Sequence, residues 1–233
     1  MGITGEQLLQ VLAAYNEQIW PLQWVAYLLG LVGLVLAIRP TSWSNRLVPA
    51  VLAFFWLWVA LLFWLPSARQ GFPPGYLLAA IFLVQGILFL NQVWRPKLTF
   101  GYQANLASWA GILFALYALV GYPAAGLVVN HIYPQAPPFG LTPCPLVTYT
   151  FGLLLLTRAR VPRSLLVVPL FYAISGLYWA TIGMVEDLGM VVSGLLGAWL
   201  IWARDARPAA VGPAEPPPAS EAAGWSLDIG DKP

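Results

Sequence analysis

The side chains best suited to chemistry are concentrated in two short segments of the sequence. Residues 130–145 contain the only histidine, His131, and the only cysteine, Cys144, among five prolines. The second segment is the consecutive acid pair Glu186 and Asp187. Thiol, imidazole and carboxylate groups together can bind a soft or borderline metal such as copper or zinc. No CxxC, HxxxH or paired-cysteine spacing is present, so the prediction of Cys144 and His131 as metal ligands depends on residue type alone.

These four residues also allow other interpretations. A Cys144–His131 pair could act as nucleophile and base, with Glu186 or Asp187 orienting the histidine. In purely structural terms, Asp187 is a favourable helix cap, Glu186 is a solvated loop residue, His131 is hydrogen-bonded in a loop, and Cys144 is a small buried side chain. Because the sequence supplies residue types without geometry, we predict no catalytic residue and no required cofactor. We treat the four as candidate ligand-binding residues.

The elements that must position these side chains are hydrophobic helices. The chain has 11 Lys and Arg and 9 Asp and Glu among 233 residues, so 9% are charged and 60% are hydrophobic. A soluble domain carries about 25% charged residues. A helix needs roughly 20 apolar residues to cross a membrane. We therefore predict an all-α membrane protein, a bundle of about seven transmembrane helices, with spans at residues 19–38, 47–65, 75–94, 105–121, 143–157, 164–183 and 188–203.

The charges between these spans predict the orientation. Every basic residue except Arg69 falls on one side of the predicted membrane, because the basic segments alternate along the chain with segments that lack basic residues. Cytoplasmic loops are enriched in Lys and Arg. We therefore expect the N-terminus outside and the C-terminus in the cytoplasm. A net charge of only +2 also argues against a nucleic-acid partner. The predicted partner is the lipid bilayer.

The two ends of the chain differ from the spans. Residues 1–18 are predicted to form an amphipathic helix on the outer membrane surface, with Thr4 and Gln7 as a capping box. Alternatively, this helix simply extends the first span. Residues 204–233 are rich in Pro, Ala and Gly and are predicted to be a disordered cytoplasmic tail.

The fifth span is predicted to be unusually short. Thr142 suits an N-cap and Pro143 suits the first helical position, which places Cys144 in the first turn, where the helix dipole favours a thiolate. Because Arg158 holds the inner end at the cytoplasmic surface, the outer end should lie below the outer surface. The proline-rich loop must then dip inward, and such backbone is tolerated only when it is buried in protein or lines a wet cavity.

Two further polar residues are candidates. Glu17 is expected on the outer face with His131, Cys144 and the acid pair, where one vestibule could hold several of them. Gln85 lies in the middle of the third span and needs a hydrogen-bond partner there. A structural hydrogen bond across the bundle and a ligand-binding role are both consistent with Gln85.

Small residues four apart predict where helices pack closely. They occur in three spans, at Ala26 and Gly30, at Ala107, Gly111 and Ala115, and at Gly189, Ser193 and Gly197. These faces could serve packing within one chain, which we favour, or contact with a second copy or another membrane protein.

Three segments resemble an uncharacterised family of bacterial multi-pass integral membrane proteins, a domain of unknown function. They are residues 14–21 (AYNEQIWP), residues 54–58 (FFWLW) and residues 139–145 (FGLTPCP), of which the proline-flanked cysteine before the fifth span is the most specific. The similarity extends from Met1 to about Trp202. The resemblance implies a multi-pass protein of the bacterial inner (plasma) membrane and no catalytic residues.

The residues and the topology together favour a small-solute or metal-ion transport or binding protein with an outward-facing vestibule. The alternative is a non-catalytic structural or accessory membrane subunit, since the spans contain no Lys, Arg, Asp or Glu. An intramembrane enzyme that uses the Cys144–His131 pair is a third interpretation.

Overall fold

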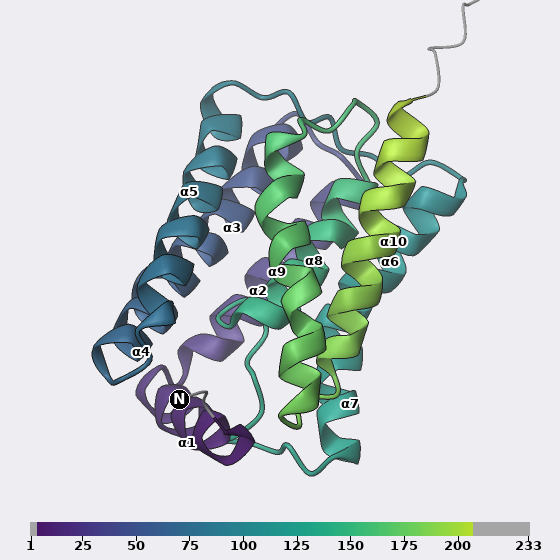
Figure 1. Cartoon of the computed structure of the whole chain (residues 1–233). Helices are drawn as coiled ribbons and strands as arrows, with labels where there is room; N and C mark the ends of the chain where they lie inside the picture. Colours follow the sequence, from purple (N-terminus) through teal and green to yellow (C-terminus); the bar gives the residue numbers. More distant parts are fainter. Residues whose placement is uncertain (1–3, 207–233) are drawn as a thin grey trace, which may run out of the picture.

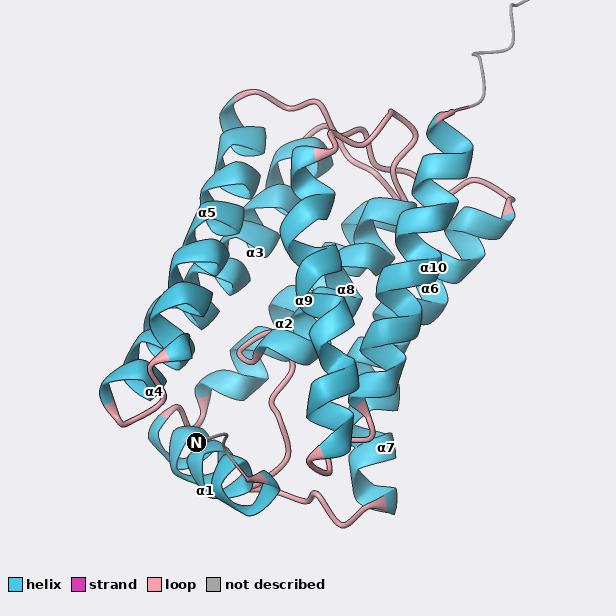
Figure 2. Cartoon of the chain, viewed as in Figure 1, coloured by secondary structure: helices cyan, strands magenta, loops and turns pink. Residues whose placement is uncertain are grey.

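The computed structural model describes residues 4–206, and these fold as helices joined by loops (Figure 2). Within this range the only extended pairing is one isolated antiparallel bridge between Phe100 and Thr157. The predicted all-α class is confirmed. The α-helices are α1 (Gly5–Gln18), α2 (Leu22–Ile38), α3 (Ser44–Trp58), α4 (Leu65–Arg69), α5 (Pro74–Trp94), α6 (Leu106–Leu116), α7 (Tyr122–Val128), α8 (Pro143–Leu155), α9 (Ser164–Thr181) and α10 (Asp187–Asp205), and two π-helical segments are η1 (Val59–Trp64) and η2 (Tyr117–Gly121).

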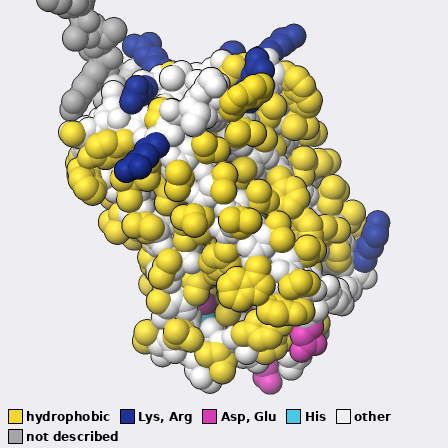
Figure 3. Space-filling model, turned by 180° about the vertical axis from the view of Figure 1, so that it is seen from behind, with side chains coloured by type: hydrophobic (Ala, Val, Ile, Leu, Met, Phe, Trp, Pro, Cys, Tyr) yellow, Lys and Arg dark blue, Asp and Glu magenta, His cyan; other side chains and the backbone are white. Residues whose placement is uncertain are grey.

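The long helices run side by side between two ends of the bundle, and α1 lies across one of them (Figure 1). We call this the α1 end and the opposite one the basic end. In Figure 3, most Lys and Arg side chains gather at the basic end and one lies apart from them, closer to the α1 end. Acidic side chains appear at the α1 end, and hydrophobic side chains cover the surface between the two ends. This surface pattern is the one expected of a bundle whose middle faces lipid.

Five helices are long and apolar enough to cross a membrane: Ser44–Arg69, Pro74–Trp94, Leu106–Val128, Ser164–Thr181 and Asp187–Asp205. The pair α1 and α2 passes the same test together but is bent by 90°. A sixth span is therefore compatible with this region, and α8 is a shorter apolar helix. A helix thus lies at each of the seven predicted segments, while the number that crosses the membrane stays a prediction.

The N-terminal helix is capped as the sequence predicts. The Thr4 side chain accepts a hydrogen bond from the Gln7 backbone, and the Gln7 side chain accepts one from the Thr4 backbone. The bend after Gln18 turns α1 away from α2, so α1 is not a straight extension of that helix. Tyr15 and Asn16 on α1 are buried against the rest of the chain.

The fourth span is longer than predicted. We expected it to end at Gly121, before the Tyr122–Pro123 pair, but the helix continues to Val128 through η2. Pro123 is tolerated because it stands in the first turn of α7, directly after a π turn. A similar π turn, η1, precedes Pro66 in the second span.

Helix α8 forms the centre of the bundle (Figure 1). Every one of its residues except Cys144 is buried. Thirteen residues rise only about 20 Å, less than a membrane core of about 30 Å. Its polar side chains bond to neighbouring helices, since Tyr149 donates to the Gly30 carbonyl at 2.6 Å and Thr150 accepts from the Trp56 indole at 3.0 Å. The short central helix is therefore held by its neighbours on all sides.

The small-residue faces are used inside this chain. A Cβ added at Gly111 would lie 2.7 Å from the Gly152 carbonyl oxygen, and one at Gly197 would lie 2.9 Å from the Phe151 ring. One at Gly30 would lie 2.2 Å from the Phe139 ring. The interpretation as internal packing fits these contacts. At these three glycines, side chains or backbone of the same chain already lie in close contact.

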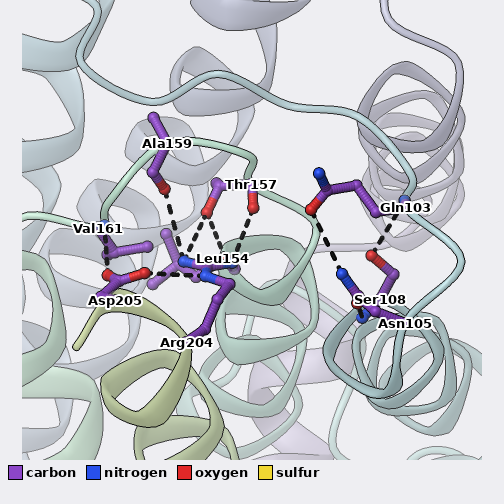
Figure 4. A network of polar contacts seen from close by, with 9 residues as sticks. All are labelled: Gln103, Asn105, Ser108, Leu154, Thr157, Ala159, Val161, Arg204 and Asp205. Atoms are coloured by element: carbon purple, nitrogen blue, oxygen red, sulfur yellow. Dashed lines mark hydrogen bonds and ion pairs between the residues drawn. The ribbon is translucent and has the colours of Figure 1, made fainter. Parts of the chain in front are cut away.

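At the basic end, α10 is fastened to the chain that follows α8 (Figure 4). Arg204 donates to the Thr157 carbonyl at 2.7 Å and pairs with Asp205 at 2.8 Å, and Asp205 accepts from the Val161 backbone at 2.9 Å. The predicted tail at residues 204–233 therefore starts too early, because Arg204 and Asp205 still belong to α10. The rest of the predicted disordered tail, residues 207–233, lies outside the described residues, as do residues 1–3.

Candidate functional site

A histidine–carboxylate pair is buried at the α1 end. His131 follows α7, and its backbone N–H donates to the Gly126 carbonyl at 2.8 Å. The ring Nδ1 lies 2.8 Å from Oε1 of Glu186, which immediately precedes α10. His131 is 8% exposed and Glu186 only 2%. Figure 3 shows histidine and acidic atoms in a narrow opening between hydrophobic side chains at this end.

The second carboxylate, Asp187, binds two different donors. Tyr122 at the start of α7 donates its hydroxyl to Oδ1, and Cys144 in the first turn of α8 donates its thiol to Oδ2 at 3.3 Å. Asp187 is 1% exposed and Tyr122 is also buried. Three helices, α7, α8 and α10, thus meet at one carboxylate. Two hydrogen bonds to the carboxylate oxygens compensate for part of the cost of burying the charge.

One atom of this cluster has no partner. Glu186 Oε2 is buried and accepts no hydrogen bond from the described residues, although Oε1 of the same carboxylate faces His131. Tyr117 donates to the backbone carbonyl of Glu186 at 2.9 Å and does not reach that oxygen. An unsatisfied buried carboxylate oxygen costs free energy, so in a native protein it calls for a bound group or water.

The pairing differs from two of the interpretations drawn from the sequence. His131 bonds Glu186 and Cys144 bonds Asp187, so the Cys144–His131 pair of a nucleophilic enzyme is not formed. Cys144 donates a hydrogen bond to a carboxylate, which describes a thiol and not the predicted thiolate. Thr142 and Pro143 do begin α8 as expected, but the Thr142 hydroxyl bonds the Pro138 carbonyl.

The geometry also gives the metal prediction no support. Among residues 4–206, no three His, Cys, Asp or Glu side chains are grouped as the ligands of one ion would be. Cys144 and His131 instead bond to two different carboxylates of the chain. The four residues are better described as a hydrogen-bonded cluster.

Two of the predicted site residues lie elsewhere. Glu17 is exposed on α1 and bonds none of the cluster residues. Gln85 is fully buried in α5, and its amide donates to the Leu165 carbonyl of α9 at 3.1 Å. Gln85 thus makes the structural hydrogen bond that we considered, far along the chain from the acid pair.

An open cleft of about 520 Å³ lies next to the cluster, between α1 and the ends of other helices. Its amide and hydroxyl groups come from Gln7 and Gln10 of α1 and from Ser67 and Gln70 at α4. The remaining lining residues are Leu8, Val11, Ala14, Phe63, Trp64, Gly71, Phe72 and Trp179. No charged residue is among them. The cleft therefore joins a neutral polar wall to an aromatic one.

A second, much smaller cavity lies beside the cluster and shares part of its wall with the cleft. It has a volume of about 30 Å³, and its lining includes Cys144, Asp187 and Tyr172. The cleft and this cavity share four lining residues, Leu8, Phe63, Trp64 and Trp179. A volume of this size is enough for about one water molecule. The aromatic wall thus separates a solute-sized opening from the buried thiol and carboxylate.

Trp64 stands at this boundary with its own unsatisfied group. It is 4% exposed, and its Nε1 donor has no partner among the described residues. The indole stacks against Phe72 at 6.0 Å and against Trp179 at 6.5 Å between ring centroids. Buried Trp N–H groups normally find an acceptor. The boundary residue therefore retains a free hydrogen-bond donor.

The two π turns supply residues on both sides of the site. Segment η1 ends with Phe63 and Trp64 of the shared wall, and η2 begins with Tyr117 and is followed directly by Tyr122. A π turn widens the helix locally and shifts every later side chain around the axis. Such turns are frequent at functional sites, which is consistent with their position here.

A comparison with known families covers nearly all of the described chain. Residues 5–210 match the model of a family of unknown function, DUF6064. The chain belongs to the DUF6064 family. No curated protein and no solved structure matches it. The match confirms the predicted membership of an uncharacterised family, while the bacterial inner-membrane location and the diagnostic value of the Pro-Cys-Pro segment stay predictions.

In this DUF6064 protein, the proline-rich loop is fixed by two residues of α1 that belong to the family-like segment at residues 14–21. Asn16 is buried, and its amide donates to the carbonyls of Pro134 at 2.6 Å and Ala136 at 2.7 Å. Tyr15 donates to the Leu141 carbonyl at 2.8 Å. The resemblance marked this segment, but only the tertiary structure shows that its side chains bind the loop.

The end of the same loop of the DUF6064 protein is embedded in aromatic side chains. Phe139 packs against Tyr27, Phe55 and Tyr149, with ring centroids 5.0–5.7 Å apart. Gly140 has φ +73°, a conformation that favours glycine, and a Cβ there would lie 2.8 Å from the Phe55 ring. Residues 137–143 are thus buried in protein, as an inward path of the loop requires, while the depth of the loop in a membrane stays a prediction.

Proposed function

We propose that this DUF6064 protein is a multi-pass membrane protein that binds a small solute at its α1 end, with the N-terminus and the cleft facing outward. In this arrangement seven segments contribute to the bundle, and the bent α1–α2 pair and the short α8 are two of them. The gathering of Lys and Arg at the opposite end supports this orientation, since cytoplasmic loops are the basic ones.

The observation that carries the binding proposal is the shared wall. Phe63, Trp64 and Trp179 line both the 520 Å³ cleft and the cavity that ends at Cys144 and Asp187. Ligand sites are typically concave, about 300–1,000 Å³ in volume and largely apolar, with a few convergent polar groups. The cleft has this size and this character, and it leads to the most polar buried cluster of the α1 end.

The alternative function, a structural or accessory subunit without a ligand, accounts for fewer features of the structure. Such a protein would satisfy its buried polar groups internally, as the basic end does. Four buried side-chain atoms remain without partners within residues 4–206, and Trp64 Nε1 of the shared wall and Glu186 Oε2 of the cluster are two of them, beside Gln23 Oε1 and Gln85 Oε1. The small-residue faces, which would be the natural contacts for a membrane partner, are already packed within the chain.

Labelling of single cysteines from one side of the membrane tests the proposal. In a Cys144→Ala background, Gln70→Cys places a thiol at the cleft, and Arg160→Cys places one at the basic end. We expect a membrane-impermeant maleimide added to intact cells to label the first and not the second. Labelling of Arg160→Cys alone would overturn the outward orientation.

A further inference from the structure

The cleft has the chemistry of a site for one class of molecule. Resting on the proposed solute-binding function, we infer that its ligand has an uncharged headgroup bearing hydroxyl or amide groups, attached to an apolar body. The alternatives are molecules with a charged phosphate, sulfate, carboxylate or ammonium headgroup.

The first observation is the absence of charge in the cleft lining. Twelve of the described residues 4–206 line the cleft, and none of these twelve is Lys, Arg, His, Asp or Glu. A charged headgroup that entered a partly enclosed site would lose water without gaining an ion partner, which is costly. A neutral headgroup loses less hydration free energy on entering the cleft, and hydrogen bonds alone can compensate for that loss.

The second observation is the kind of polar group that the cleft offers. Gln10 from α1 and Gln70 after α4 are both exposed, and neither side chain is engaged in a hydrogen bond within residues 4–206. Each amide offers donors and an acceptor at once. Hydroxyl and amide headgroups need both hydrogen-bond donors and acceptors as partners. A phosphate group needs mainly donors, and an ammonium group needs only acceptors.

The third observation is the aromatic wall on the inner side. Trp64 stacks between Phe72 and Trp179 and retains an unpartnered indole N–H. Flat aromatic surfaces bury an apolar body, and the N–H can bond an acceptor that lies below the headgroup. The amide groups of the cleft thus suit the headgroup of an amphiphile, and the aromatic wall suits its apolar body.

The position of α1 provides a route for such a molecule. The bend of 90° before α2 lays α1 across the end of the bundle, where the cleft opens beneath it. A helix that lies in the membrane interface is at the depth of lipid headgroups. The ligand could enter from the outer leaflet or, if its apolar body is short, from the aqueous phase.

The test uses the full-length protein in nanodiscs and the single native thiol as the reporter. Cys144 is modified with methyl methanethiosulfonate in the presence of hexyl β-glucoside, hexyl sulfate, hexylphosphocholine or free glucose. We expect hexyl β-glucoside to slow modification at least about tenfold and the two charged probes to leave it unchanged. Protection by glucose alone to the same degree would identify an aqueous sugar-like ligand with the same headgroup chemistry.

Variants of the polar wall provide the controls. Gln10→Leu and Gln70→Leu should each weaken protection by hexyl β-glucoside about tenfold, the effect of one lost hydrogen bond of about 1.4 kcal/mol. Gln18→Leu, an exposed position on α1 outside the cleft lining, should have no effect.

Two results would overturn the inference. Equal protection by the charged probes would contradict the neutral headgroup while leaving solute binding intact. Absence of protection by every probe would contradict the inference as well. In that case, outside labelling of Gln70→Cys decides separately whether the proposed outward-facing site survives.

Discussion

The two ends of the bundle both hold buried or partly buried ionisable side chains, but they satisfy them differently. At the basic end, Arg204 and Asp205 are 19% and 18% exposed and bond each other and the backbone of residues 157–161. At the α1 end, Glu186 and Asp187 are at most 2% exposed, and one of their four oxygens has no partner.

This difference distinguishes a network that holds a helix end in place from a cluster that could take part in binding a ligand. A network whose groups are all paired and partly hydrated stabilises a helix end at modest cost. Carboxylates removed from water with incomplete pairing cost much more, and such arrangements are concentrated at functional sites. The contrast fits a structural role for the Arg204 network and, under the proposed function, a ligand-related role for the cluster around Glu186 and Asp187.

The largest expected effect comes from breaking the buried pair. Replacing His131 with Ala leaves the buried Glu186 carboxyl without its side-chain hydrogen-bond partner, and an unsatisfied buried polar group of this kind costs about 3 kcal/mol. Denaturation of the purified protein in detergent would measure the loss. We expect the double variant His131→Ala, Glu186→Gln to recover part of it, because no uncompensated charge remains. A single variant as stable as the wild type would contradict the buried pair.

A smaller effect is expected where α1 holds the proline-rich loop. Asn16→Ala removes two hydrogen bonds to loop carbonyls, at a cost of about 2 kcal/mol. The loop should then be cut faster by chymotrypsin after Phe139, which is followed by glycine and is only 1% exposed in the intact loop. The matched control is Gln18→Ala, two residues further along α1 and exposed. Equal cleavage of the two variants would show that Asn16 does not fix the loop.

Breaking the basic end should cost less and leave the cleft unchanged. Arg204→Ala loses its bonds to the buried Thr157 and to Asp205, but the Arg204 and Asp205 side chains are partly exposed to water, so we expect a loss of about 1 kcal/mol. Arg160→Ala, an exposed residue of the same end, should lie within about 0.5 kcal/mol of the wild type. If Arg204→Ala also changed the rate of Cys144 modification, the two ends would be coupled. That result would contradict the separate roles given to the basic end and the α1 end.

The smallest effect is expected in the middle of the bundle. Gln85 makes one hydrogen bond to Leu165, and its other amide atom, Oε1, is already unpaired. Gln85→Leu removes that unsatisfied atom together with the bond, so the change in stability should stay below about 1 kcal/mol. A larger loss, measured by the same denaturation assay, would assign Gln85 a role that the structure does not show.

Much of the architecture follows from the sequence because it depends on local patterns. Apolar runs bounded by charges place the helices, and the run from Pro143 to Arg158 is too short for a full span, which predicts the inward path of the loop. The capping box at Thr4 and Gln7 needs only a spacing of three residues.

The site itself was only partly accessible to such reasoning. His131, Cys144, Glu186 and Asp187 stand out by residue type, but their pairing depends on how α7, α8 and α10 pack. Tyr122 is neither a rare residue type nor part of a spacing motif, and the resemblance of residues 14–21 to a family does not say what Asn16 binds. The π turns leave no simple pattern in the sequence either, so the cleft wall at η1 could not be foreseen.

The most direct test of the account is the access of a small thiol reagent to Cys144 through the cleft. The chain has one cysteine, so methyl methanethiosulfonate reports on this position alone, with Cys144→Ala as the blank. Ala14→Trp places a large side chain in the cleft, whereas Gln18→Trp places it on α1 outside the lining. We predict that Ala14→Trp slows modification at least tenfold, on the order of 1.4 kcal/mol in barrier, and that Gln18→Trp leaves it unchanged. Equal rates in the two variants would contradict a site that is reached through the cleft.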